Sequence, residues 1–180
     1  TIVNISDKTN PTGIGTYTSS TYLDSPQSVY VNGSFAYIAA KKSSYGTMTI
    51  IDVTDVTSPS FISSTNLAEL NGLDIFVLGN YSYVTSYNKF GSSAFEIFNI
   101  SNKTNPDFLI SYTDVAPPNS IDSPNSIYVI GGYAYIASGS DDSFTIINVS
   151  EFVPKDDNTV PVLNLVNVSD SGSTLTNINC

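Results

Sequence analysis

Short runs of alternating apolar and polar residues follow one another along the chain, separated by turn-forming residues. Such alternation places successive side chains on opposite faces of a strand, whereas helices need apolar residues spaced three and four apart. Four of the runs end in Asn or Asp, an aliphatic residue and Ser or Thr, at separations of 48, 47 and 49 residues. These endings are Asn4-Ile5-Ser6, Asp52-Val53-Thr54, Asn99-Ile100-Ser101 and Asn148-Val149-Ser150. A period in the high forties filled with short strands predicts the blades of a β-propeller.

A second marker recurs with the same repeat and predicts a tight hairpin in each copy. An aliphatic-aromatic-valine run leads, six residues later, into a small residue, a tyrosine and an aliphatic residue. The first runs are Ser28 to Val31, Asp74 to Val77 and Ser126 to Val129, and the second are Ala36-Tyr37-Ile38, Ser82-Tyr83-Val84 and Ala134-Tyr135-Ile136. The predicted two-residue turns are Asn32-Gly33, Gly79-Asn80 and Gly131-Gly132, because Gly and Asn best tolerate the positive dihedrals that such turns need.

Two further strands complete each unit. The predicted third strands are Ile2 to Ile5, Thr47 to Val53, Ala94 to Ile100 and Phe144 to Val149. A turn ending in proline follows, which stops one strand and prepares the next. The predicted fourth strands are Gly13 to Tyr17, Ser60 to Ser64 and Phe108 to Tyr112. The fold class is therefore all-β, with blades of four antiparallel strands: about three blades plus an orphan strand.

These residues resemble a known repeat family. An apolar triplet, Asp or Asn, an aliphatic residue and Ser or Thr, followed by a turn that ends in proline, is similar to the LVIVD repeat of prokaryotic surface β-propellers. Ile50-Ile51-Asp52-Val53-Thr54 is its closest copy, and Gly132-Tyr133-Ala134-Tyr135-Ile136 supports it independently. The resemblance covers residues 1 to about 150. It implies a propeller fold, export and no assigned reaction, and it supplies no catalytic residues.

The end of the chain differs from the repeats. Residues 151–159 are charged and lack alternation, which predicts a linker, and residues 160–180 contain a further strand. This strand either completes a blade or begins an immunoglobulin-like domain in which Cys180 would be the cysteine of the second strand. An open arc of three blades would leave two apolar faces uncovered, so we expect further domains of the same polypeptide or other copies of it to cover them.

Composition narrows the function. The 180 residues include 12 tyrosines and 9 phenylalanines, which are enriched in strands. The net charge is -10, and all six basic residues are lysines, so the chain repels a phosphate backbone and nucleic-acid binding is excluded. Histidine is absent, which removes the usual general base and the commonest metal ligand. No stretch of the sequence is apolar and long enough to predict a membrane span.

Asparagine sequons are the clearest candidates for modification. They predict glycosylation on an exported chain, and the alternative for the copies at one repeat position is a local turn hydrogen bond. The candidates are Asn32, Asn80, Asn102, Asn4, Asn99, Asn148 and Asn167, of which the first three are favoured because they lie at predicted hairpin tips or in a loop.

No cofactor is predicted, and the carboxylates give only weak alternatives. Asp141 and Asp142 lie in a Ser- and Gly-rich loop that could help to hold calcium, although it lacks the spacing of a calcium loop. Asp52 and Asp55 are separated by two residues, and a pair of facing carboxylates is what acid-base chemistry on a sugar requires. Because Asp52 occupies a repeat position, we expect a structural role for it and no catalytic residues in the chain.

One loop is longer than its counterpart and is the predicted contact surface. The spacing between equivalent strand positions is 52 residues from Ile75 to Ile127 and 46 from Val29 to Ile75. Insertions at a fixed place in a repeat lie on one rim and often carry binding residues. The contact candidates are Pro117, Pro118, Asn119 and Ile121.

The sequence therefore predicts an extracellular or cell-surface repeat protein of a prokaryote, with a structural or adhesive role and no catalysis. Its partners would be other copies, further domains, or surface glycans or proteins. The first alternative is a subunit of a filament or ring in which copies complete each other's blades or strands. The second is a glycan-active enzyme.

Overall fold

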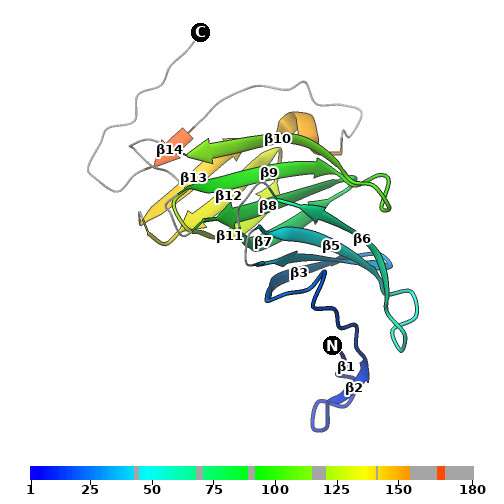
Figure 1. Ribbon diagram of the computed structural model, residues 1–180. Coiled ribbons are helices and arrows are strands. Elements are labelled where there is room, and N and C mark those ends of the chain that lie inside the picture. The colour runs from blue at the N-terminus through cyan, green and yellow to red at the C-terminus, as the bar shows by residue number, and fades with distance from the viewer. Residues whose placement is uncertain are drawn as a thin grey trace.

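The computed structural model describes residues 1–42, 45–67, 71–88, 92–114, 121–140, 142–154 and 166–168. Over these residues the protein is all-β, apart from one short 3-10 turn, as the sequence predicts. Three four-stranded antiparallel sheets lie side by side, and a two-stranded hairpin precedes them at the N-terminus (Figure 1). The predicted fold class, blades of a propeller, is confirmed.

The strands follow the chain in simple order from the inner to the outer edge of each sheet. The N-terminal hairpin consists of β1 (Ile2–Asn4) and β2 (Thr12–Gly15). Blade 1 contains β3 (Pro26–Asn32), β4 (Phe35–Ala40), β5 (Thr47–Asp52) and β6 (Ser60–Asn66). Blade 2 contains β7 (Asn71–Leu78), β8 (Tyr81–Tyr87), β9 (Ser93–Asn99) and β10 (Asp107–Asp114). Blade 3 contains β11 (Pro124–Ile130), β12 (Tyr133–Ser138), β13 (Ser143–Asn148) and β14 (Val166–Val168).

The first two strands of each blade form a tight hairpin, and one predicted turn is shifted by a residue. The turn in blade 1 is Gly33-Ser34, because Asn32 still pairs with Phe35 in the ladder, so the prediction of Asn32-Gly33 was wrong. Gly33 has a φ of 59°, as Gly79 has a φ of 60° at the equivalent place in blade 2. The positive φ therefore falls on the first turn residue, which is glycine.

Each third strand ends in a local turn held by the side chain of the repeated Asn or Asp. The side-chain oxygen of Asp52 accepts a hydrogen bond from the backbone nitrogen of Thr54 at 2.7 Å. Asn4, Asn99 and Asn148 accept the same bond from the residue two places on, at 2.9 Å each. This turn explains why only Asn and Asp occupy the position, as the local-turn alternative predicts.

Alternation along the strands gives each blade two different apolar faces. One face, which we call the aliphatic face, carries Val29 and Val31 in blade 1, Ile75 and Val77 in blade 2, and Ile127 and Val129 in blade 3. The opposite face, which we call the aromatic face, carries Tyr30 and Tyr37 in blade 1 and Phe76 and Tyr83 in blade 2. Successive residues of a strand point to opposite sides of the sheet, so the repeat places the same chemistry on the same side of every blade.

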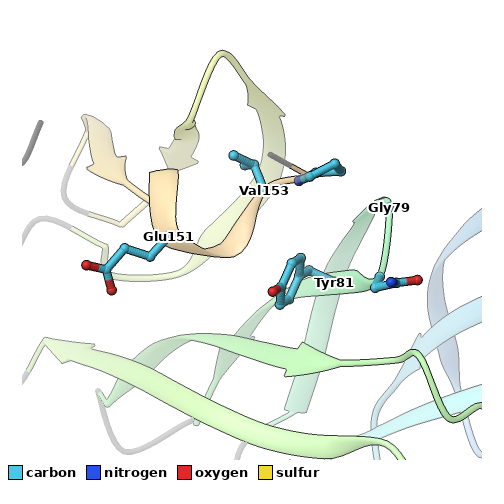
Figure 2. A pocket seen from close by; sticks show the side chains of 6 residues that line it. Gly79, Tyr81, Glu151 and Val153 are labelled. Atoms are coloured by element: carbon cyan, nitrogen blue, oxygen red, sulfur yellow. The ribbon is translucent and has the colours of Figure 1, made fainter. Parts of the chain in front are cut away.

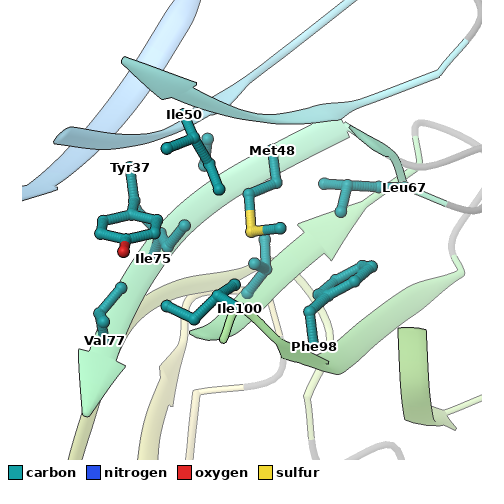
Figure 3. Close-up of a cluster of buried hydrophobic side chains, with 10 residues drawn as sticks. Tyr37, Met48, Ile50, Leu67, Ile75, Val77, Phe98 and Ile100 are labelled. Atoms are coloured by element: carbon teal, nitrogen blue, oxygen red, sulfur yellow. The ribbon is translucent and has the colours of Figure 1, made fainter. Parts of the chain in front are cut away.

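The blades stack by packing unlike faces together. Side chains from the aromatic face of blade 1 and the aliphatic face of blade 2 form one buried cluster (Figure 3). Its buried members are Tyr37, Ala39, Met48, Ile50, Leu67, Ile75, Val77, Val84, Phe98 and Ile100. A second cluster joins blades 2 and 3 in the same way, and its buried members are Tyr83, Phe95, Ile97, Ile121, Ile127, Val129, Ala134, Ile136 and Val149. These two clusters are the hydrophobic core over the described residues.

After β13 the chain turns back onto blade 2. A 3-10 turn, η1 (Ser150–Phe152), begins a segment of residues 150–154 that we call the C-terminal strap. The hydroxyl of Tyr83 donates a hydrogen bond to the carbonyl oxygen of Phe152. The ring of Phe152 meets the ring of Tyr81 edge-on, with centroids 6.1 Å apart. The described part of the predicted linker is therefore packed against blade 2.

The tail strand lies in the place of a fourth blade strand. β14 pairs antiparallel with β13, with Val168 opposite Phe144 and Val166 opposite Ile146. Residues 155–165 and 169–180, including the Cys180 that the immunoglobulin-like alternative requires, lie outside the described residues.

Candidate functional site

No blade covers the aliphatic face of blade 1 within the described ranges. Val29 is 61% exposed and Val31 is 58% exposed, whereas the equivalent Val77 and Val129 are 2% and 3% exposed. The three positions are aliphatic in every repeat, so the difference comes from the neighbour: within the described residues, blades 2 and 3 each have a blade against this face and blade 1 does not. Exposed aliphatic pairs of this kind are typical of surfaces that another element covers.

The aromatic face of blade 3 likewise has no neighbouring blade in the described part of the chain. Phe144 is 47% exposed, whereas Phe95 at the equivalent position of blade 2 is 2% exposed in the second cluster. Tyr128 and Ile130, on the inner strand of the same face, are 55% and 54% exposed. The two ends of the stack therefore present faces of opposite kind, aliphatic at one end and aromatic at the other.

The outer strand of blade 2 is a third exposed apolar surface. Phe108, Leu109 and Ile110 of β10 are 55%, 39% and 48% exposed. The ring of Phe108 still contacts the ring of Phe98 edge-on, with centroids 5.7 Å apart. In blade 1 the ring of Tyr22 stacks on Phe61, which occupies the position of Phe108, at 4.2 Å between centroids.

A carboxylate joins the inner strands of all three blades. Asp74 of β7 accepts hydrogen bonds from the hydroxyl of Ser28 in β3 at 2.5 Å and from the backbone nitrogen of Ile127 in β11 at 2.8 Å. It also accepts a bond at 2.9 Å from the backbone nitrogen of Ile75. The two other repeats have serine at this position, and this departure from the repeat is the only signal in the sequence that could have singled out Asp74.

Three aromatic rings extend the contact between the inner strands. The ring of Phe76 lies 4.9 Å from that of Tyr30 and 5.0 Å from that of Tyr128, measured between centroids. The three residues occupy one repeat position, and their contact in series shows that β7 lies between β3 and β11. Tyr37 and Tyr83 are buried between blades, and Tyr30 and Phe76 pack against the same clusters, whereas Tyr128 is 55% exposed.

A partly open pocket of about 310 Å³ lies where the C-terminal strap crosses the turn between β7 and β8 (Figure 2). It is lined by Gly79, Asn80, Tyr81, Glu151, Val153 and Pro154. Among these described lining residues Glu151 is the one carboxylate, and none is a cation. The pocket therefore lies between two segments that pack against each other, the β7–β8 turn and the C-terminal strap.

The sequon asparagines differ in exposure. Asn32, Asn80, Asn102 and Asn4 are exposed, whereas Asn99 and Asn148 are half-buried. In the Asn102 sequon the side-chain oxygen accepts bonds from the backbone nitrogen and the hydroxyl of Thr104, at 3.1 and 2.8 Å. Asn167 belongs to β14, and its side chain is outside the described part. The structure thus leaves Asn32, Asn80 and Asn102 as the accessible members of the favoured set.

The predicted contact loop is only partly described, and one of its residues is misassigned. Pro117, Pro118 and Asn119 lie outside the described residues. Ile121 has no exposed surface and belongs to the second buried cluster, so its prediction as a contact residue was wrong. Ile121 lies shortly before β11 in the chain and packs in the cluster between blades 2 and 3.

Asp52 and Asp55, the candidate pair of facing carboxylates, each accept hydrogen bonds within a local turn. No group of three His, Cys, Asp or Glu residues that could hold a metal occurs in the described part of the chain. Asp142 is exposed, and Asp141 lies outside that part. Asp55 accepts hydrogen bonds from the hydroxyl and the backbone nitrogen of Thr57, at 2.6 and 2.9 Å. These bonds hold the pKa of Asp55 below its usual value, and Asp52 shows the same direction through Thr54.

The sequence matches the LVIVD repeat family over residues 1–19, 25–66, 71–114 and 123–152. The chain belongs to this family. The matched LVIVD segments cover the N-terminal hairpin, blades 1 and 2 and the first three strands of blade 3, and the gaps between them fall in the connections from one blade to the next. The resemblance in the sequence is therefore confirmed.

The LVIVD family is defined by a structural repeat and is not known as an enzyme family. No curated protein matches the chain. Within the described ranges, no helix has the length and apolar character to cross a membrane.

Proposed function

We propose that this LVIVD repeat protein acts at the extracellular surface of a prokaryotic cell, in a structural or adhesive role and without catalysing a reaction. The observation that carries the proposal is the set of uncovered apolar faces at both ends of the blade stack and along β10. Large side chains such as Val29, Phe108 and Tyr128 are more than half exposed there. Contiguous apolar surface of this kind serves to contact other macromolecules or other parts of a larger assembly.

The charge and the polar turns support the same role. A net charge of -10 keeps such a chain soluble despite its apolar faces. The same local turn, closed by an Asn or Asp side chain, ends each third strand, and such regular repeats suit a scaffold. Accessible sequons such as Asn102 are compatible with glycosylation on an exported chain.

Surface labelling of intact cells tests the location. A membrane-impermeant biotin reagent reacts with exposed lysines, and the chain has six, of which Lys8 lies in the exposed N-terminal turn. We expect the chain to be biotinylated on intact cells to the same extent as after lysis. Labelling that appears only after lysis, with a known surface protein labelled in both samples, would contradict the surface role.

A second candidate function, a subunit of a ring or filament, is favoured by the unlike faces at the two ends. Within the chain, the aromatic face of one blade covers the aliphatic face of the next. The aromatic face of blade 3 in one copy could therefore cover the aliphatic face of blade 1 in another, so that copies stack head to tail. Light scattering across a concentration series distinguishes the two: growth of mass with concentration supports assembly, and a constant monomer mass contradicts it.

A further inference from the structure

Six of the seven sequons lie within the described residues, and in four of these the asparagine is held by its own sequon. The side-chain oxygen accepts a hydrogen bond from the backbone nitrogen of the Ser or Thr two places on, which is the third residue of the motif. The distances are 2.9 Å in the sequons of Asn4, Asn99 and Asn148 and 3.1 Å in that of Asn102. The spacing that defines a sequon is thus also the spacing that closes the local turn.

Exposure alone therefore does not present a sequon to an enzyme. Asn102 and Thr104 are both exposed, but the asparagine oxygen also accepts a hydrogen bond from the threonine hydroxyl at 2.8 Å. A transferase that recognises Asn-x-Ser/Thr must reach the asparagine amide and the hydroxyl, since the motif specifies both. In this turn the two groups bind each other, so the turn must open before an enzyme can bind them.

The Asn80 sequon is blocked in a different way, by the position of its serine. Asn80 is the second residue of the turn between β7 and β8, so the third residue of its motif, Ser82, lies inside β8. Ser82 has no exposed surface, and its hydroxyl donates a hydrogen bond to the sulfur of Met48 at 3.0 Å, across the joint between blades 1 and 2. The turn is also crowded, because a Cβ on Gly79 would lie 2.4 Å from Pro154 of the C-terminal strap.

The Asn32 sequon differs because its asparagine ends β3, one residue before the turn. Its serine, Ser34, is therefore a turn residue and lies outside both strands. Asn32 and Ser34 are exposed, and neither side chain makes a hydrogen bond within the described part of the chain. The space around the turn is open, since a Cβ on Gly33 would meet nothing within 4 Å. The backbone is nevertheless held, because the carbonyl oxygen of Ser34 accepts a hydrogen bond from the backbone nitrogen of Val53 at 2.8 Å.

We propose that Asn32 is the glycosylated asparagine among the described sequons, and that the folded structure protects the other five. In the transfer, the side-chain nitrogen of Asn32 attacks the anomeric carbon of an oligosaccharide carried on a polyprenyl diphosphate. The bond from that carbon to the diphosphate oxygen breaks, the diphosphate leaves with the electron pair, and the nitrogen loses a proton to a carboxylate of the transferase. The inference rests on the proposed role outside the cell, where the transferase would meet the folded chain. An oligosaccharide at this turn would keep the tip of the first hairpin of blade 1 in solvent.

Transfer to the purified, folded chain tests this choice of site. The reaction contains a single-subunit oligosaccharyltransferase that accepts Asn-x-Ser/Thr peptides and a polyprenyl diphosphate carrying a disaccharide of N-acetylglucosamine, and mass spectrometry measures the occupancy of each asparagine. Synthetic peptides of residues 28–38 and 100–110 carry the Asn32 and Asn102 sequons without the fold. Relative to its own peptide, Asn32 of the folded chain should be modified at least about tenfold faster than Asn102, where two hydrogen bonds must first break.

The matched variants remove one exposed hydroxyl each. Ser34→Ala should abolish the modification of Asn32 and keep the circular dichroism of the parent chain, because this hydroxyl makes no hydrogen bond with the described residues. Ser6→Ala makes the same exchange in a sequon whose asparagine is held in its turn, and it should leave the modification of the chain unchanged.

Three results would overturn the proposal: equal relative rates at Asn32 and Asn102, modification of Asn80 as fast as that of Asn32, or an unmodified Asn32 in a folded chain whose Asn32 peptide is modified. Because the test uses purified protein, its failure concerns the site alone. Failure of the surface labelling on intact cells would instead concern the proposed location.

Discussion

Replacing Asp74 tests whether one carboxylate holds the inner strands of the blades together. In Asp74→Ala, the hydroxyl of Ser28 and the backbone nitrogen of Ile127 lose their common acceptor, at present 2.5 and 2.8 Å away. The third donor, the backbone nitrogen of Ile75, lies in the same strand as Asp74 and does not link blades. The two bonds that link neighbouring blades therefore disappear together.

The magnitude follows from these two bonds. A hydrogen bond to a charged group contributes about 1.5–3 kcal/mol, and because Asp74 is only half-buried we take the lower end for each. Asp74→Ala should thus lower the free energy of unfolding by about 3 kcal/mol, which corresponds to a fall in Tm of roughly 6–12 °C for a chain of this size. Asp74→Asn keeps one neutral acceptor and should lose about half as much.

Thermal and urea unfolding, followed by circular dichroism, measure this loss. The matched control is Asp52→Asn, which removes the same charge but keeps its turn, because asparagine fills that position in the other repeats. We expect the control to unfold close to the parent chain at neutral pH. If Asp74→Ala lowers the Tm no more than Asp52→Asn, then the contacts of Asp74 do not join the blades and the reasoning is refuted.

Three further predictions concern the strap, the buried phenols and the turn carboxylates. Gly79→Ala should lower the Tm more than Gly33→Ala: both positions have a positive φ, but a Cβ at Gly79 would lie 2.4 Å from the proline of the C-terminal strap and one at Gly33 meets nothing within 4 Å. Equal losses would show that the strap does not rest on the hairpin. Burial raises the pKa of Tyr37 to about 12 and also raises the pKa of Tyr83. The contribution of these two phenols to the free energy of unfolding should therefore be fully present below about pH 10. It should fall as the pH rises toward 12, because the phenols lose their protons at lower pH in the unfolded chain than in the folded chain. Absorbance at 295 nm checks this, and ionisation of every tyrosine near pH 10 in a chain with native circular dichroism would contradict it. Hydrogen bonds from Thr57 lower the pKa of Asp55 from 3.8 in the folded chain. The contribution of this charge to the free energy of unfolding is therefore present above about pH 4 and is lost as the pH falls through the pKa of Asp55 in the folded chain. The difference in Tm between the parent and Asp55→Asn should therefore vanish in acid, and a difference that persists in acid would contradict a role of the charge.

Most of the fold could be predicted because it is local and repeated. Alternation fixes the strands, and the Asn-aliphatic-Ser ending fixes where each third strand stops, since its side chain closes its own turn. The one shifted hairpin turn shows the limit of this reasoning. Asn32 and Gly33 both tolerate a positive φ, and only the pairing of Asn32 with Phe35 decides which of them lies in the turn.

Features that depend on contacts between blades could not be predicted. The role of Asp74 requires that three inner strands separated by about fifty residues meet, which no local pattern shows. Ile121 looked like an exposed loop residue because its neighbours in the sequence are polar or proline, yet it is buried against blade 2. The number of blades predicted two uncovered apolar faces, but the repeat itself could not show that Val29 and Val31 lie on one of them, because these valines differ from their equivalents only in what lies against them.

The central claim is that neighbouring blades, and not local sequence, decide which apolar faces are covered. Thiol-labelling rates of single cysteines at the equivalent positions Val31, Val77 and Val129, each in a Cys180→Ser chain, test it most directly. We predict that Val31→Cys reacts at the rate of an exposed thiol and that the other two react at least about a hundredfold more slowly, because labelling them requires the blades to separate. Similar rates at all three positions in a folded chain would contradict the stacked arrangement.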